Sequence, residues 1–140
     1  MLLLGHAGFA AFFARYLHAP LPYVAAAALL PDLFDKSLFI FGMVPSTRWL
    51  AHSVFFGLAL AALAFFFLRT QALPFAILLG SWAHLLLDGE HFLPLFYPAV
   101  QYAWPAGGLS LSLDPLSLAF ELFGLLSLFF LWRRQGGTHA

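Results

Sequence analysis

The sequence predicts an all-α protein: one domain, residues 1–140, folded as an integral membrane bundle of about five helices. Hydrophobic residues make up 63% of the chain and charged residues only 9%, whereas about 25% of residues in a typical soluble domain are charged. The long apolar stretches are separated by segments that contain proline and glycine, which end helices. These observations together predict membrane helices joined by short turns.

Charge and cysteine content limit the possible partners and sites. The formal net charge is zero, which argues against nucleic acid as a partner. The sequence contains no cysteine, which excludes disulfides and thiolate zinc ligands. Any bound metal must therefore be held by histidine, aspartate or glutamate.

The first two helices are expected over residues 2–18 and from residue 21 to about residue 30. No basic residue precedes the first apolar run, so we expect a membrane helix there instead of a signal peptide. The second helix is shorter than the about 20 residues that a span requires. We therefore expect a partial span that breaks at residues 31–36 and is completed by the apolar segment 37–44.

The third helix is expected to begin near Ser46, a possible N-cap, and to end at Arg69. The fourth follows Pro74 and reaches about Asp88, where Gly89 can terminate it. These two segments are almost purely apolar along most of their length.

A loop is expected over residues 97–114, with tyrosines and a tryptophan that suit a membrane interface. Asp114 followed by Pro115 is typical of a helix start. We expect the fifth helix to run from there to residues 132–134.

Five spans would divide the basic residues between two sides of the membrane. One side would carry Arg15, Arg69, Arg133 and Arg134. The other would carry Lys36 and Arg48. The positive-inside rule makes the first side cytoplasmic, so we expect a prokaryotic cytoplasmic membrane with the N-terminus outside and the C-terminus inside. Seven ionisable residues then gather on the outer side: His6, Asp32, Asp35, Arg48, His52, His84 and Asp88.

His84 and Asp88 are four residues apart, so a helix presents both on one face. Two ligands on one face are what a metal site requires, and His91 follows on the same stripe. The simpler alternative is that the two side chains bond each other inside the bundle. Because ionisable groups are costly in hydrocarbon, those that occur there usually serve a function.

Asp32 and Asp35 are neighbours on one turn if the segment is helical. Two adjacent carboxylates need a cation between or beside them. A divalent metal and an ion pair with Lys36 or Arg48 are equally good interpretations.

Arg48 and His52 would share a helix face at i and i+4. An arginine can bind phosphate through two parallel hydrogen bonds, or extend towards lipid head groups. Glu121 is about two turns into the fifth helix, where its carboxylate must pair with the metal, with Arg48 or with a nucleophilic water.

The ordered set of these motifs resembles the YdjM-like family of small membrane-bound, metal-dependent hydrolases, some of them LexA-regulated. The resemblance covers about residues 5–125 and is carried by His6, residues 31–36, Arg48-x3-His52-Ser53, Ser81-x2-His84-x3-Asp88 and Glu121. The order of ligands is also similar to that of zinc-dependent phospholipase C.

The chain departs from the family pattern in two places. Many members have Pro-Asp-x-Asp, in which the second aspartate is one residue closer than Asp35 is here. Many also have His-Arg-Gly-x-Thr-His-Ser, where this chain has Thr47, Trp49 and Ala51 at the first, third and fifth places.

Motifs and resemblance together lead us to expect a membrane-embedded hydrolase that cleaves a phosphate ester of a lipid or lipid-linked substrate with a metal-activated water. The expected metal ligands are His6, Asp32, His52, His84 and Asp88. Asp35 is expected to be a further ligand or the base, and Arg48 and Glu121 complete the catalytic set. The metal is expected to be zinc, as one or two ions, with manganese or magnesium as alternatives. The alternative function is a metal-ion or proton transporter without hydrolytic activity.

Overall fold

The structure, a computed structural model, describes residues 3–89, 92–105 and 114–136, and this part contains helices and no strand. The helices are α1 (Leu3–Tyr16), α2 (Leu21–Ile40), the short 3-10 helix η1 (Leu50–His52), α3 (Val54–Leu68), α4 (Ala72–Leu87) and α5 (Pro115–Gly136). The predicted all-α fold with five main helices is therefore confirmed.

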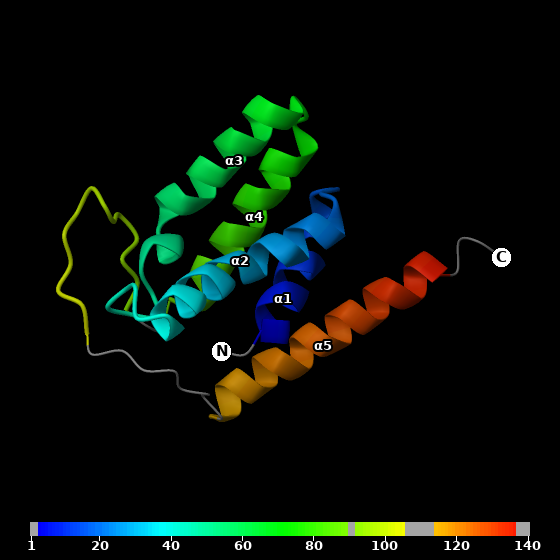
Figure 1. Cartoon of the computed structure of the whole chain (residues 1–140). Coiled ribbons are helices and arrows are strands. Elements are labelled where there is room, and N and C mark those ends of the chain that lie inside the picture. The colour runs from blue at the N-terminus through cyan, green and yellow to red at the C-terminus, as the bar shows by residue number, and fades with distance from the viewer. Residues whose placement is uncertain (1–2, 90–91, 106–113, 137–140) are drawn as a thin grey trace.

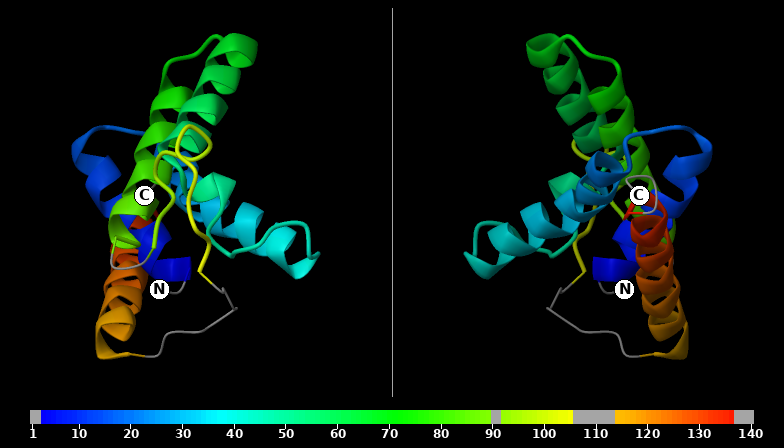
Figure 2. Two further views of the ribbon diagram at one scale, coloured as in Figure 1. Left: turned by 90° about the vertical axis from the view of Figure 1, so that its left-hand side faces the viewer. Right: turned by 90° about the vertical axis from the view of Figure 1, so that its right-hand side faces the viewer.

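The helices are packed around the pair formed by α2 and α4 (Figure 1). The helix α1 lies against α2, α4 and α5, and α3 forms a hairpin with α4. Two further views show this hairpin projecting from one side of the molecule, with α5 alongside α1 (Figure 2). One end of α1, the middle of α2, η1 and the end of α4 consequently meet.

Small residues allow two of these helix pairs to touch at the backbone. A Cβ atom added to Gly80 would lie 2.7 Å from the Cβ of Ala27 and would collide with the carbonyl oxygen of Val24, so α4 is in direct contact with α2. A Cβ atom on Gly8 would collide with the backbone of Gly124, so α1 and α5 cross there. Glycines at such crossings are typical of helices that pack closely in membranes.

The predicted break at residues 31–36 is wrong, because α2 continues through it as one helix. Pro31 removes one helical hydrogen bond, but other contacts keep the turn helical. Lys36 Nζ donates to Asp32 Oδ2 at 2.6 Å, and Ser37 Oγ donates to the carbonyl of Leu33 at 2.5 Å. Pro31 is itself buried.

The predicted start of the third helix is also wrong. Residues 41–49 form turns, and α3 begins at Val54 with Ser53 as its N-cap, whose Oγ accepts from the amide of Phe56. Arg48 and His52 therefore do not share a helix face. The physical reason is a tertiary contact: the carboxylate of Asp35 binds three backbone amides between residues 49 and 52 and holds this segment in a loop.

Of the other predicted boundaries, the start of the fourth helix is wrong, because α4 begins at Ala72 and contains Pro74 in its first turn, and the following ones are confirmed. Arg69 ends α3 in the left-handed conformation, with a φ of 50°. Asp114 Oδ1 accepts from the amide of Ser117 at 2.9 Å, so Asp114 caps α5 as expected. The described part of the predicted loop, residues 97–105, is not helical, and residues 106–113 lie outside the described residues.

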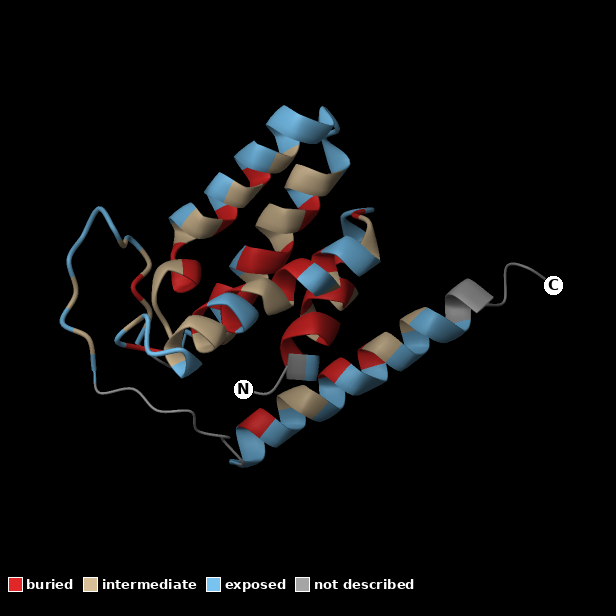
Figure 3. Cartoon of the chain, viewed as in Figure 1, coloured by how far each residue is buried: buried red, intermediate tan, exposed pale blue. Residues whose placement is uncertain are grey.

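One described helix is long and apolar enough to cross a membrane, namely α5 over Pro115–Arg133. At about 1.5 Å per residue, α3 and α4 are only about 22–24 Å long, shorter than a hydrocarbon core of about 30 Å. Large apolar side chains nevertheless face outwards, and the exposed fraction reaches 74% for Phe66 and 71% for Trp132. Most of the outer face of α5 is exposed (Figure 3).

Candidate metal centre

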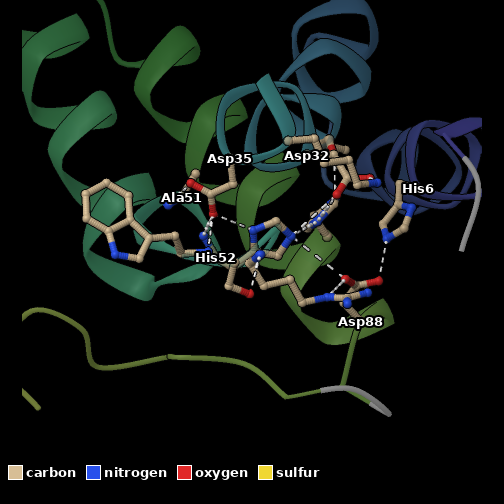
Figure 4. Close-up of polar contacts among 12 residues, drawn as sticks. His6, Asp32, Asp35, Ala51, His52 and Asp88 are labelled. Carbon is tan, nitrogen blue, oxygen red and sulfur yellow. Dashed lines mark hydrogen bonds and ion pairs between the residues drawn. The ribbon is translucent and has the colours of Figure 1, made fainter. Parts of the chain in front are cut away.

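The five predicted metal ligands lie together inside the molecule, although they come from four separate segments (Figure 4). They are His6 from α1, Asp32 from α2, His52 from η1, His84 from α4 and Asp88, which follows α4. All five are buried. Two groups of three offer ligand atoms that all lie within 4.8 Å of one another: His6, Asp32 and His84, and His52, His84 and Asp88.

The imidazole of His84 is oriented by the backbone of α2. Its Nδ1 lies 2.8 Å from the carbonyl oxygen of Ala28. A carbonyl can only accept a hydrogen bond, so this contact assigns the proton to Nδ1 and turns Nε2 towards the centre. The close approach of Gly80 to α2, one turn earlier, makes this contact possible.

The imidazole of His52 is oriented in the same way by a carboxylate. Its Nδ1 lies 2.8 Å from Asp35 Oδ2, so Nε2 of His52 also points to the centre. The Nε2 atoms of His52 and His84 face each other at 3.2 Å. With both Nδ1 atoms already donating, two facing lone pairs repel each other unless a proton or a metal ion lies between them.

The distance between the two nitrogens fits one metal ion. Two nitrogens bound at about 2.0–2.1 Å to a tetrahedral ion lie about 3.3 Å apart, close to the 3.2 Å seen here. The second ring nitrogen of each histidine is held by an oxygen, as is usual for metal-bound histidines. The ring of His6 stacks on that of His84 with centroids 4.1 Å apart, which places a third imidazole beside the pair.

Two carboxylates complete the centre, and each has a basic side chain beside it. Asp32 Oδ1 lies 3.5 Å from Nε2 of His52, while its Oδ2 accepts from Lys36 at 2.6 Å. Asp88 Oδ1 lies 3.2 Å from Nε2 of His6, and its Oδ2 accepts from Arg48 Nε at 2.8 Å. Lys36 and Arg48, which are not candidate ligands themselves, therefore hold the two carboxylates in place.

These contacts shift the proton affinity of the two candidate ligands that lie outside the α-helices. Burial opposes ionisation of Asp88, but the hydrogen bond from His6 and the charge of Arg48 outweigh it and hold the pKa of Asp88 well below its usual range. Burial likewise opposes protonation of His52, but hydrogen bonds to Asp32 and Asp35 raise its pKa. The centre thus attracts positive charge, as a cation site requires.

Asp35 occupies a different place from the one predicted. Its carboxylate accepts from the amides of Trp49, Ala51 and His52 at 2.6, 3.1 and 3.2 Å, and from the His52 ring. It is fully buried and belongs to neither group of converging atoms. These four hydrogen bonds make Asp35 a residue that orients His52 and its loop, in place of the expected ligand or base.

Glu121 also lies away from the converging atoms. Its Oε1 accepts from the amide of Gly5 at 3.0 Å, so it ties α5 to the first turn of α1, next to His6. Arg48 does reach the centre, but from the loop before η1 and through Asp88. Glu90 and His91, the latter predicted as a possible extra ligand, lie outside the described residues.

One contributor to the centre was missed by sequence reasoning. The carbonyl of Ala28 orients His84, and no sequence pattern marks a backbone oxygen. The ion pair between Lys36 and Asp32 was one of the two interpretations that the sequence left open, and the spacing i and i+4 indicates it.

Comparisons of the chain with protein-family models, with curated proteins and with solved structures gave no match. Function is therefore argued from the geometry of the centre.

Proposed function

We propose that the protein is a membrane-embedded, metal-dependent hydrolase that cleaves a phosphate ester of a lipid or lipid-linked substrate. The observation that carries this proposal is the pair of buried histidines whose Nε2 atoms face each other at 3.2 Å. Because the Nδ1–H groups of the two rings donate to Ala28 and Asp35, the facing Nε2 atoms offer lone pairs to a cation.

Zinc suits this set of ligands best. Three imidazoles and two carboxylates form a nitrogen-rich site, and imidazole favours zinc over magnesium or calcium. Five candidate ligands in two overlapping groups are enough for one ion or for two, with manganese or magnesium as the alternatives. A bound ion would lower the pKa of a water molecule and polarise the scissile phosphate.

Arg48 is suited to the substrate phosphate. It donates to Asp88 through Nε, and no described residue bonds its two terminal nitrogens. Its side chain is 26% exposed, whereas Asp88 is almost fully buried. A partly exposed guanidinium at the edge of a metal site can bind phosphate oxygens and offset the charge that develops in the transition state.

The membrane setting is supported by composition and by the outer surface. The chain is 63% hydrophobic, α5 is long enough to span, and its outer face carries exposed leucines and phenylalanines. Large exposed apolar surfaces mark contacts with a membrane or with another protein. The orientation with the centre facing outwards in a prokaryotic cytoplasmic membrane remains a prediction from the positive-inside rule.

The alternative function is a metal-ion or proton transporter. One observation favours it, namely that His52 and His84 are fully buried and therefore inaccessible in this conformation. Ion pathways carry ionisable groups along the depth of the membrane. The helix α3 has none along its whole length, and the candidate ligands are gathered at one end of α4. This distribution favours the hydrolase.

The proposal is tested by incubating the purified, metal-loaded protein with phosphate-ester lipids and measuring released phosphate or head group. We expect hydrolysis that a chelator abolishes and that zinc or manganese restores. Metal uptake into proteoliposomes without hydrolysis of any such lipid would instead favour the transporter.

A further inference from the structure

An open groove lies between α1 and α5. It measures about 300 Å³ and is lined by apolar residues only: Phe9, Leu116, Ala119, Phe120 and Phe123. The rings of Phe9, on α1, and Phe123, on α5, are tilted relative to each other, with centroids 6.2 Å apart. The groove therefore offers an aromatic wall and no ionisable group.

Both walls of the groove are connected to the first turn of α1, which carries His6. Phe9 follows His6 by three residues, or about 4.5 Å along the helix axis. Phe120 precedes Glu121, whose carboxylate accepts from the amide of Gly5. The groove thus begins within one helical turn of a candidate metal ligand.

His6 links the groove to the metal centre, because it lies on α1 together with Phe9. In the close-up, the polar side chains form a row with Asp35 at one end and His6, on α1, at the other (Figure 4). Asp88 Oδ1 lies 3.2 Å from Nε2 of His6, and its Oδ2 accepts from Arg48 Nε at 2.8 Å. A molecule with an anionic head at Arg48 and an apolar tail that passes His6 would match both features.

We propose that the groove binds one alkyl chain of the lipid whose phosphate lies at the metal centre. This inference rests on the proposed function and specifies its substrate. The groove opens on α5, the helix able to span a membrane, where lipid chains are the surrounding medium. Its volume is at the lower end of the about 300–1,000 Å³ of small-molecule sites and is too small for a helix of about 10 Å diameter.

An alkyl chain that enters the groove from the membrane interior exchanges one apolar environment for another. The fit between the chain and the shape of the groove therefore determines how tightly the chain binds. Lipid tails offer no hydrophobic gain over the membrane interior. The groove should therefore select the length and form of the chain next to the phosphate, and filling the groove should affect long-chain substrates alone.

The binding arm of the experiment uses metal-loaded protein in detergent and an alkyl phosphate with a photoactivatable group on its chain. Labelled peptides are identified by mass spectrometry. We expect label on Phe9 and Phe120 in the parent. We expect at least a fivefold loss of this label in Ala119→Trp, whose new ring fills the groove, and no loss in Leu122→Trp, a matched change on the outward face of α5.

The kinetic arm compares a long-chain and a short-chain phosphate ester. Ala119→Trp should raise KM for the long-chain ester about tenfold and leave kcat and the short-chain KM unchanged. Bound metal should stay at the parental level, because no candidate ligand is altered.

Three results would overturn the groove as a chain site. One is label spread evenly over the outer faces of α3 and α5, as bulk lipid would give. Another is an equal loss of activity on both esters. The third is a change of oligomeric mass in Ala119→Trp with unchanged label, which would point to a second copy of the chain in the groove. If the parent protein hydrolyses neither ester, the proposed hydrolase function is wrong, and the photolabelling result alone then tests whether the groove binds an alkyl chain.

Discussion

The Nε2 atoms of His52 and His84 face each other at 3.2 Å in the buried interior. Each ring is held by an acceptor behind it, Asp35 for His52 and the carbonyl of Ala28 for His84. This arrangement fixes both lone pairs on one point between η1 and α4. Substitutions of the surrounding residues test how the fold keeps the two Nε2 atoms in this position.

Asp35 should act through His52. In Asp35→Asn, the amide group presents donors to backbone amides that also donate, which costs about 1–3 kcal/mol per unsatisfied buried group. We expect a lower melting temperature and a metal affinity about 10–100-fold weaker, as for other groups that orient ligands. Calorimetric titration with zinc and thermal unfolding measure these effects.

Asp114→Asn is the matched control for Asp35→Asn. Asp114 also accepts from a backbone amide, but at the start of α5, where asparagine caps a helix as well as aspartate does. An equal loss of metal affinity in both variants would contradict the orienting role of Asp35.

Gly80 should be intolerant of any side chain. In Gly80→Ala, the new Cβ meets the backbone of α2 and lies 2.7 Å from the Cβ of Ala27. Separating α2 from α4 should cost about 1–3 kcal/mol and lengthen the bond between His84 and Ala28. We expect reduced stability together with weaker zinc binding.

Gly57→Ala provides the comparison for Gly80→Ala. Its Cβ would lie 3.1 Å from the Cβ of Ser81 and 3.3 Å from the ring of Trp82, which a small shift relieves, whereas the Cβ on Gly80 would collide with a backbone oxygen. Thermal unfolding should therefore show a smaller loss for Gly57→Ala; a larger loss would refute the importance of the crossing between α2 and α4.

Ser81 should be dispensable despite its place one turn before His84. Its Oγ is buried and has no hydrogen-bond partner among the described residues. Removing an unsatisfied buried hydroxyl relieves its desolvation cost, so Ser81→Ala should be as stable as the parent or more stable. It should also retain full metal content; loss of metal would assign the hydroxyl to the centre.

Glu121 should support the site without taking part in the chemistry. Glu121→Gln keeps an oxygen that can accept from Gly5, so we expect unchanged metal content and nearly unchanged hydrolysis. Glu121→Ala removes the acceptor and should lower stability by about 1 kcal/mol. A hundredfold loss of kcat in Glu121→Gln, with metal retained, would restore the catalytic role that the sequence predicts.

The sequence predicts which residues form the centre better than it predicts the backbone conformation around them. Helix spacing and the order of motifs indicate His6, Asp32, His52, His84 and Asp88, and the structure brings these five together. Their binding of a metal remains a prediction. Ionisable residues are so rare in this apolar chain that nearly every one of them stands out.

The errors arise where tertiary contacts override local signals. Pro31 predicts a break, but burial and the bond between Lys36 and Asp32 keep α2 continuous. Ser46 is an acceptable N-cap, but Asp35 binds the amides between residues 49 and 52 and delays α3 until Val54. The same contact turns Asp35 from an expected ligand into an orienting residue, which spacing alone does not reveal.

The most direct measurement is the metal content of the detergent-purified protein by elemental mass spectrometry, alongside His84→Ala, Asp88→Asn and the Ser81→Ala control. One or two equivalents of zinc or manganese in the parent and in Ser81→Ala, lost in the other two folded variants, is the result expected. A parent that binds no metal, even after incubation with zinc, manganese and magnesium, would contradict the metal centre and with it the hydrolase.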